Sequence, residues 1–389
     1  MTPGTGKVPL GQKLAWGLGG LADNFMMNAV VTLIMPIYNI GFGVSAIWLG
    51  VATAIPRFLD ALTDPVMGGI SDSTTSRWGR RRPYILAGTV LCALLFPLLW
   101  MPPFAGETGR LIWFFAIYVI FTLAYTVYVV PYTALGIELT TDYDERTRVM
   151  AWRMILGLLG SIAVPWIYLL TRLDVFGGNE VVGIRPVSLL IAVAILACGL
   201  PPALMVRERT FEQSGAKFDF REGLRLVLGN RPFLLLLFAY VVILCGLFVG
   251  GSFGLYVNIF HVFGGDKTAA ATISGIAGTV TAGAAYASIF LATWTATHFG
   301  KKTAMLWGLG LGTLGGASMW FTMTPSAPYA QLISAALIGL GLQGCWLMVS
   351  SMTADICDLD ELQTGLRREG LFSALVGFVQ KAAFALIAL

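Results

Sequence analysis

The fold prediction starts from residues 46–83, AIWLGVATAIPRFLDALTDPVMGGISDSTTSRWGRRRP. They begin as an apolar run of membrane-spanning length, carry ionisable side chains inside that run, and end in a short basic turn before the next apolar run. A helix needs about 20 residues to cross the hydrocarbon, and basic turns between spans stay on the cytoplasmic side. The pattern therefore predicts a membrane helix at 46–71, a cytoplasmic turn, and a second membrane helix from residue 83.

The rest of the chain has the same character. Of its 389 residues 57% are hydrophobic and 12% charged, whereas a soluble domain has about 25% charged residues. No soluble domain of this length buries so much apolar surface, which excludes a soluble enzyme, a disordered protein and a secreted disulfide scaffold. The apolar runs are continuous rather than alternating, which excludes a membrane barrel. The five cysteines and two histidines show neither metal-ligand nor disulfide spacing.

Apolar windows predict eleven membrane spans. The positive-inside rule places the N-terminus in the cytoplasm, because 18 of the 25 basic residues lie in connections on that side and four lie opposite. The last span has no polar residues after it, and we expect the protein to continue beyond Leu389. The predicted spans are 14–40, 46–71, 83–102, 109–139, 149–171, 186–206, 232–261, 269–297, 303–323, 328–356 and 371–389.

Two features recur six spans apart. The glycine of the basic turn, Gly79, recurs at Gly300, and Glu138 at the end of the fourth span recurs as Asp355 at the end of the tenth. Both displacements equal six spans, so the halves run parallel. An all-α polytopic protein with two parallel six-helix bundles has the major-facilitator architecture, and a twelfth helix is expected after Leu389.

This repeat defines the expected domains. Residues 1–206 form the N-terminal bundle, 207–231 a cytoplasmic linker, and 232–389 a truncated C-terminal bundle. Within the linker, residues 218–228 alternate apolar and charged side chains in a way that favours a helix on the membrane surface. The alternative is a plain inter-domain linker.

The second span holds the densest group of intramembrane charges. Arg57, Asp60 and Asp64 stand at i, i+3 and i+7 on one helical face, with Thr63 beside them. Two carboxylates one turn apart repel each other until a proton, a cation or a base relieves them. Oxygen ligands suit a hard cation such as Na⁺. The group predicts a Na⁺ or proton coupling site, with a structural ion-pair network around Arg57 as the alternative.

Other polar residues within spans are candidates for the solute pathway. Asp23 and Asn24 lie in the first span, where Asp23 either lines the pathway or pairs with a basic residue of the bundle. Tyr125, Tyr128 and Tyr132 form a stripe on the fourth span that serves either helix packing or as a platform for a sugar.

Three further residues complete the intramembrane candidates. Arg153 lies early in the fifth span, where snorkelling to the interface is the alternative to solute binding. Trp346 in the tenth span is a candidate for either the pathway or the core. Lys381 lies deeper in its span, and a lysine in the membrane interior needs a functional reason.

Charged residues at the cytoplasmic ends of the spans form a candidate gate. Basic side chains in the turns can cap helix C-termini or pair with acidic helix ends. The pattern predicts a latch that favours one of two bundle arrangements, with topology determination alone as the alternative. The candidate gate residues are Asp72, Arg77, Gly79, Arg80, Glu138, Asp142, Asp355 and Arg367.

These motifs resemble one family. Residues 57–68 (RFLDALTDPVMG) followed by 76–80 (SRWGR) look like the signature of the glycoside–pentoside–hexuronide:cation symporters, which include the melibiose permeases. Residues 131–140 (PYTALGIELT) resemble the fourth-helix segment of that family, and residues 354–370 resemble its loop between helices ten and eleven. The resemblance covers essentially the whole chain.

The resemblance implies a cation site. Asp60 and Asp64 match the two cation-site carboxylates of the family. Thr63 stands where melibiose permeases have an asparagine, and Thr126 matches a threonine near that site. Lys381 matches a lysine at the interface of the two halves, and we expect its ammonium within about 8 Å of an Asp60 or Asp64 carboxylate in at least one transport state.

The implied solute site departs from the family pattern. Arg153 and Trp346 match a sugar-site arginine and a sugar-facing tryptophan. Four positions differ, so melibiose is not the expected solute; loss of the two acids tilts the site toward a neutral or acidic solute such as a uronide, and Asp23 opposes this. The departures are Asn24 and Val129 in place of sugar-binding aspartates, Asp23 in place of a lysine, and Thr133 in place of a tryptophan.

Taken together, the sequence predicts a multi-pass secondary symporter of the cytoplasmic (inner) membrane. It would move a sugar or glycoside-like solute with Na⁺ or H⁺ by rocking two bundles around a midplane site. Membrane lipids are the other expected partners; we expect a monomer without nucleic acid or cofactor. A carrier of a lipid-like or other non-sugar solute is the first alternative, and a non-transporting sensor, which could lose Asp60 and Asp64, is the second. No nucleophile–base pair or metal cluster suggests an enzyme.

Overall fold

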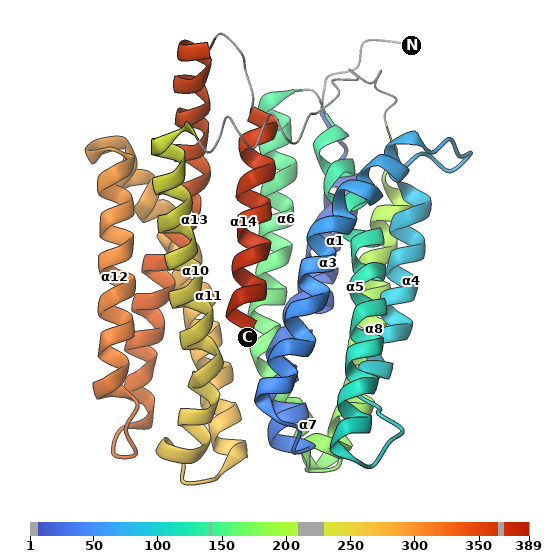
Figure 1. The fold of residues 1–389 in the computed structure, drawn as a ribbon, viewed down its shortest axis with the longest axis vertical. Coiled ribbons are helices and arrows are strands. Elements are labelled where there is room, and N and C mark those ends of the chain that lie inside the picture. Colours follow the sequence, from blue (N-terminus) through green and yellow to red (C-terminus); the bar gives the residue numbers. More distant parts are fainter. Residues whose placement is uncertain (1–6, 141, 209–228, 365–368, 389) are drawn as a thin grey trace. The chain divides into compact units, whose positions relative to one another are not determined.

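The computed structural model describes residues 7–140, 142–208, 229–364 and 369–388, and all their regular elements are helices (Figure 1). By its internal contacts the chain divides into two compact units, residues 1–213 with 388–389 (unit 1) and residues 214–387 (unit 2). The predicted surface helix at 218–228 and the candidate gate residue Arg367 lie outside the described residues.

Unit 1 holds the first six predicted spans, drawn from blue to yellow-green in Figure 1. Its first span is one continuous helical rod in which two π segments interrupt the α-helix. The elements are α1 (Leu10–Asp23), η1 (Asn24–Asn28), α2 (Ala29–Ile34), η2 (Met35–Gly41), α3 (Ala46–Ser73), α4 (Arg82–Leu99), α5 (Glu107–Glu138), α6 (Tyr143–Ala163), η3 (Val164–Trp166), α7 (Ile167–Thr171), η4 (Asp174–Phe176) and α8 (Glu180–Met205).

Unit 2 holds the other five predicted spans. Among the residues that the structure describes, eight helices are long and apolar enough to cross a membrane. Of the other predicted spans, 232–261 falls on α10 with η5, 303–323 falls on α12, and the described part of 371–389 falls on α14. The elements are α10 (Arg231–Val257), η5 (Asn258–Val262), α11 (Lys267–Phe299), α12 (Lys301–Thr322), η6 (Pro328–Ala330), α13 (Gln331–Thr364) and α14 (Glu369–Ala388).

Glycine lets the helices of unit 1 approach closely. On α4, a Cβ at Gly88 would stand 2.6 Å from the backbone nitrogen of Tyr128 on α5. On α5, a Cβ at Gly136 would overlap the indole ring of Trp16, which stacks on Tyr132 with ring centroids 5.4 Å apart. In a membrane such close packing replaces the hydrophobic effect as the force between helices.

One π segment follows the repeat and one does not. The π segments η2 and η5 end at Gly41 and Val262. These two residues are as far apart in the sequence as Gly79 and Gly300, so η2 and η5 occupy corresponding places in the first helix of each unit. By the same displacement η1 corresponds to residues 245–249, which are regular α-helix within α10. The π turn at Asn24–Asn28 is thus specific to unit 1.

Candidate functional site

We call the four residues predicted to bind a cation the cation group: Asp60, Thr63, Asp64 and Thr126. They lie where α3 meets α5. The Thr126 hydroxyl on α5 donates a hydrogen bond of 2.6 Å to Asp60 Oδ1 on α3, and both residues are buried, at 7% exposure for Asp60 and 2% for Thr126. The Thr63 hydroxyl donates to the backbone oxygen of Asp60 at 3.3 Å. Asp64 lies one turn further along α3 and is half-buried. A buried carboxylate beside hydroxyl oxygens can hold either a proton or a hard cation.

The described residues contain no cluster of three or more His, Cys, Asp or Glu side chains that could hold a metal ion. The oxygen atoms of the cation group belong to the side chains of Asp60, Thr63, Asp64 and Thr126.

A second group of polar side chains, which we call the solute group, joins three helices of unit 1. It consists of Asp23, Tyr125 and Arg153. Asp23 at the end of α1 accepts a hydrogen bond of 2.7 Å from the Tyr125 hydroxyl on α5, through Oδ1. Its other oxygen pairs at 3.3 Å with Nη2 of Arg153 on α6. The side chains of Arg153 and Asp23 remain 29% and 22% exposed. Asp23 thus pairs with a basic residue of the bundle, and Arg153 points to that acid rather than to the membrane interface.

Aromatic rings fix the position of the arginine. The Arg153 guanidinium lies 5.3 Å from the ring centroid of Tyr132 and 5.9 Å from that of Trp16. Both rings are fully buried. A cation over the faces of two rigid rings is held by their quadrupoles, so that the guanidinium edge stays turned toward Asp23.

The tyrosine stripe serves two purposes. The hydroxyls of Tyr128 and Tyr132 donate to the backbone oxygens of Gly19 and Trp16, each at 2.9 Å, and their rings stack 5.3 Å apart. Tyr128 is completely buried and packs α5 against α1. Its predicted contact with a solute stays a prediction. Tyr125, which was predicted only as part of the stripe, instead contacts Asp23.

The remaining solute candidates are dispersed. Thr133 is half-buried on α5. In unit 2, Trp346 packs edge-on against Tyr240, with ring centroids 5.6 Å apart, at the margin of the hydrophobic core. Lys381 is half-buried on α14 of unit 2. Because Asp60 and Asp64 belong to unit 1, their predicted closeness to Lys381 stays a prediction.

Two arginines of the basic turn close the ends of α3 and α5. Arg80 Nη2 contacts both Glu138 oxygens, at 2.8 and 3.0 Å, and Arg81 Nη2 contacts Asp72 and Glu138 at 2.8 Å each. With Glu208, described next, these four residues form what we call the charge cluster of unit 1.

Glu208, just beyond α8, completes the cluster. Its carboxylate accepts hydrogen bonds from the backbone N–H groups of Arg80, Arg81 and Arg82, at 2.6, 2.8 and 2.8 Å. Successive N–H groups at the start of a helix attract an anion, here at the start of α4. Gly79 has a φ of +104°, and a Cβ there would stand 2.7 Å from the Glu208 carboxyl carbon. No sequence motif identified Glu208, because its partners are backbone groups.

Two predicted gate residues, Arg77 and Asp142, lie outside the charge cluster of unit 1. Arg77 is exposed and takes part in none of the ion pairs of the cluster. Asp142 is the N-cap of α6, where its Oδ1 accepts a hydrogen bond of 2.9 Å from the Glu145 N–H. Glu145 in turn pairs with Lys13 at 2.6 Å and accepts a hydrogen bond of 2.8 Å from the Val8 N–H, and the bond from Lys13 lowers the pKa of Glu145.

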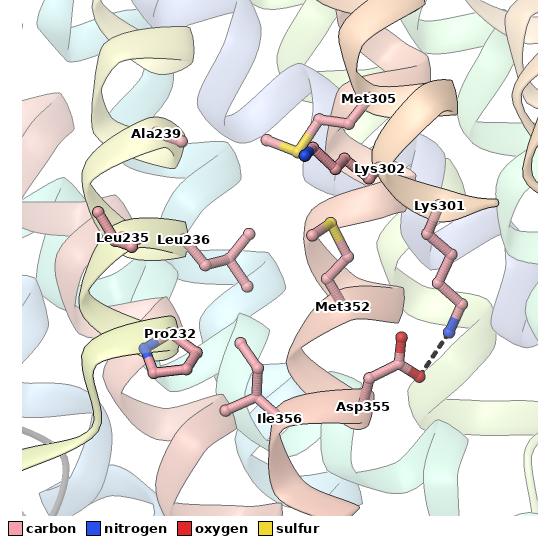
Figure 2. A pocket seen from close by; sticks show the side chains of 10 residues that line it. All are labelled: Pro232, Leu235, Leu236, Ala239, Lys301, Lys302, Met305, Met352, Asp355 and Ile356. Carbon is pink, nitrogen blue, oxygen red and sulfur yellow. Dashed lines mark hydrogen bonds and ion pairs between the residues drawn. The ribbon is translucent and has the colours of Figure 1, made fainter. Parts of the chain in front are cut away.

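Unit 2 repeats the turn in a simpler form. Gly300 again has a positive φ, +86°, and Lys301 pairs with Asp355 at 2.6 Å (Figure 2). These two side chains are 38% and 55% exposed. They lie at the edge of a cavity of about 440 Å³ between α10, α12 and α13, whose other walls are mostly apolar, including Leu236, Met305 and Met352.

The fold and these groups define a transporter of the major-facilitator class. Residues 15–388 match the model of the family described as MFS/sugar transport protein, and the chain belongs to that family. The chain is 28% identical over 386 residues to the "Uncharacterized symporter YnaJ" of Bacillus subtilis, covering 98% of this chain and 81% of that relative. It is 25% identical over 379 residues to the "Isoprimeverose transporter" of Lactiplantibacillus pentosus, covering 96% and 77%.

A solved structure supports the fold. The crystal structure of a D-xylose–proton symporter superposes with a TM-score of 0.64 at 15% identity, over 97% of this chain and 88% of that one. The major-facilitator fold and the symporter family predicted from the motifs are confirmed. The protein is therefore a multi-pass membrane protein and a secondary symporter for a small molecule, not an enzyme.

Proposed function

We propose that the protein moves a sugar or glycoside-like solute inward across the cytoplasmic membrane, coupled to Na⁺ or H⁺. One observation carries the coupling. Tyr125 and Thr126 are neighbours on α5, and their hydroxyls donate to Asp23 of the solute group and to Asp60 of the cation group. Any shift of α5 that accompanies binding at one group therefore changes the hydrogen bond at the other.

The cation group supplies the driving force in this proposal. Protonation would convert Asp60 from an acceptor into a donor, and Na⁺ would take over carboxylate oxygens; both events alter the bond from Thr126. In the cation-free state the ammonium of Lys381 would approach Asp60 or Asp64 across the two units. The cation would displace that contact and so bias the equilibrium between inward- and outward-facing states.

The solute group favours a neutral, hydroxyl-rich solute. Asp23 already offsets the charge of Arg153, so the pair has no net charge to offer a uronide. A carboxylate accepts hydrogen bonds from hydroxyls and a guanidinium donates to ring and hydroxyl oxygens. Thr133 and Trp346 would line the same pathway, with the solute held near the midplane while the bundles rock around it.

The charge clusters would face the cytoplasm. The excess of basic residues in the turns supports an N-terminus inside and an inner-membrane location. There the charge cluster of unit 1 and the Lys301–Asp355 pair act as the latch that favours one arrangement of the bundles. We expect a monomer in contact with membrane lipids.

The test is uptake into proteoliposomes from a panel of neutral sugars, glycosides and uronides, with and without Na⁺ and pH gradients. We expect gradient-driven accumulation of a neutral member of the panel. Replacing Asp60 or Asp64 by Asn should abolish accumulation against a gradient while solute exchange partly survives, because the driving ion is lost before the solute site. The matched control is Arg77→Gln, at the exposed basic residue outside the cluster. Normal accumulation by well-folded Asp60→Asn and Asp64→Asn variants would overturn the coupling, and uptake of no sugar would overturn the solute class.

A further inference from the structure

One end of α5 holds the loop that joins the first two spans of unit 1. Residues 42–45, which we call the far loop, precede α3, whose other end lies beside the charge cluster. The Glu107 carboxylate accepts a hydrogen bond of 2.9 Å from the Ser45 N–H, and Arg110 Nη1 donates to the Phe42 backbone oxygen at 2.8 Å. The Arg110 guanidinium also lies 5.1 Å from the centroid of the Phe42 ring. Two charged side chains of α5 thus clamp the far loop.

The same helix reaches the cation group. Thr126 lies about 29 Å along α5 from Glu107, at 1.5 Å per residue, and residues 111–124 between them contain neither proline nor glycine. In this stretch Phe114 packs against Tyr38 on η2, which leads into the far loop, with ring centroids 4.7 Å apart and both rings fully buried. Closely packed interiors transmit strain, and packed helices shift as units. A displacement of α5 at Thr126 therefore reaches the far loop.

The corresponding loop of unit 2 is closed by its own helix. By the repeat Ser45 corresponds to Asp266, whose Oδ1 accepts hydrogen bonds from the N–H groups of Thr268 and Ala269 on α11, at 2.9 and 3.0 Å. Ser45 makes no such side-chain cap on α3, and its N–H bonds to α5 instead. The far loop is thus held from α5, the helix that also contacts Asp60.

We propose that binding of Na⁺ or a proton at the cation group loosens the far loop through α5, so that the state of Asp60 controls how readily this end of unit 1 rearranges during transport. The proposal rests on the proposed function and deepens it. While Asp60 is ionised and binds no Na⁺, the Thr126 hydroxyl donates to it at 2.6 Å and holds α5 against α3. Either ion competes for the carboxylate oxygens. Thr126 is then released, and α5 moves its clamp away from the loop.

Hydrogen exchange with mass spectrometry tests this link in peptides that contain Ser45. All samples are kept at pH 7, where Glu107 is ionised. NaCl is compared with KCl at equal ionic strength, and Asp60→Asn in KCl stands in for the protonated carboxyl. We expect Na⁺, Asp60→Asn or both to accelerate exchange at the Ser45 amide about tenfold, the effect of losing one hydrogen bond to a charged group. Peptides that cover residues 263–266 of unit 2 should not respond.

Two valine variants separate the proposed route from a general loss of packing. In Thr126→Val the bond to Asp60 is already lost, so exchange at Ser45 should be fast in every condition. Thr122→Val is the matched control on the same helix: its hydroxyl donates to the backbone oxygen of Tyr118 at 2.9 Å, within α5, so the response should persist. Size-exclusion chromatography in detergent checks that each variant is folded.

The clamp itself gives a reciprocal test, because coupling between two sites acts equally in both directions. Where Na⁺ is the effective ion, Glu107→Ala should strengthen equilibrium binding of ²²Na⁺ by the factor by which Na⁺ accelerates exchange at Ser45, about tenfold. Unchanged exchange with Na⁺ and in Asp60→Asn, in a protein that accumulates its solute, overturns the link and leaves the proposed function intact. A response that Thr122→Val removes as fully as Thr126→Val also overturns it. Wild-type protein without gradient-driven accumulation overturns both proposals.

Discussion

The two basic turns, one in each unit, both contain a glycine of positive φ but differ in the charged contacts that hold them in place. In each unit a glycine with positive φ precedes a basic residue that pairs with an acid of the fourth long helix. Arg80 pairs with Glu138 at the end of α5, and Lys301 pairs with Asp355, which lies before the last turns of α13. In unit 1 a second arginine and two more acids surround this pair. In unit 2 the pair stands at the surface, beside a cavity.

The difference separates two requirements of the motif. Glycine is needed for the backbone conformation of the turn, and the charged side chains hold the turn in place. Both turns need glycine for the backbone, but only at Gly79 does a partner occupy the space of a Cβ, whereas the same space at Gly300 is open. An exposed ion pair contributes about 0–1 kcal/mol. In unit 1 the Nη2 of Arg80 contacts both oxygens of Glu138, the Nη2 of Arg81 contacts two carboxylates, and the Glu208 carboxylate accepts from three N–H groups. These contacts are stronger than an exposed pair, because charge-assisted hydrogen bonds are about twice as strong as neutral ones. We expect unit 1 to be rigid at this end and unit 2 to open readily.

Removing Glu208 should have the largest effect on the difference in stability between the two turns. In Glu208→Ala the N–H groups of Arg80, Arg81 and Arg82 lose their acceptor, so we expect the opening free energy at these amides to fall by about 2–4 kcal/mol. Hydrogen exchange with mass spectrometry measures it. Asp355→Asn is the counterpart in unit 2 and should change exchange at Lys301 by less than about 1 kcal/mol. Equal effects in the two units would show that the turns are equivalent after all.

Substituting the glycine of each turn should also distinguish the two turns, with a smaller effect. Gly79→Ala adds a Cβ at positive φ and into the Glu208 carboxylate, while Gly300→Ala adds only the backbone strain. Holding an L-residue in such sparsely populated positive-φ conformations costs about 1–3 kcal/mol. Both variants should lower the midpoint of thermal unfolding in detergent, and only Gly79→Ala should also accelerate exchange at residues 80–82. If Gly79→Ala in a Glu208→Ala background still adds this local effect, the carboxylate contact is not its cause.

The sequence predicted the spans and indicated that basic residues of the first turn pair with acidic helix ends such as Glu138, because these signals are strong; it did not predict the pair between Lys301 and Asp355. A membrane demands about 20 apolar residues for each crossing, and the repeat ties Gly79 and Glu138 to their counterparts. The contacts of Glu208 were not predicted, because its partners are backbone N–H groups. The tyrosine stripe shows a second limit. Tyr125 and Tyr128 share one face of α5, and only the position of α1 decides that the first reaches Asp23 while the second is buried against Gly19.

The π turn marks a third limit. The sequence between Asn24 and Asn28 gives no sign that the helix forms a π turn there. A local widening of the helix is not encoded in the apolar pattern. Comparison of the two units reveals it, because the equivalent residues 245–249 remain α-helical.

The smallest expected effect is a pH dependence confined to unit 1. Glu145 binds the Lys13 ammonium and the Val8 N–H, and the hydrogen bond from Lys13 holds the pKa of Glu145 below its ordinary value. The positions of unit 2 that correspond by the repeat, Leu234 and Leu362, are both apolar and form no such contact.

The sign follows from the direction of this shift. A carboxyl with a lower pKa in the folded state stabilises that state fully above the unfolded-state value of about 4.3, and the contribution disappears as the pH falls through the lower folded value. Hydrogen exchange at Val8, corrected for the intrinsic rate, should therefore show protection at pH 7 that is lost near the folded pKa, while α12 is unaffected. In Glu145→Gln, which cannot ionise, protection at Val8 should be low and independent of pH. If wild-type Val8 keeps its protection in acid, the contact does not depend on the Glu145 charge, and the N-terminal segment is held by packing of Val8 alone.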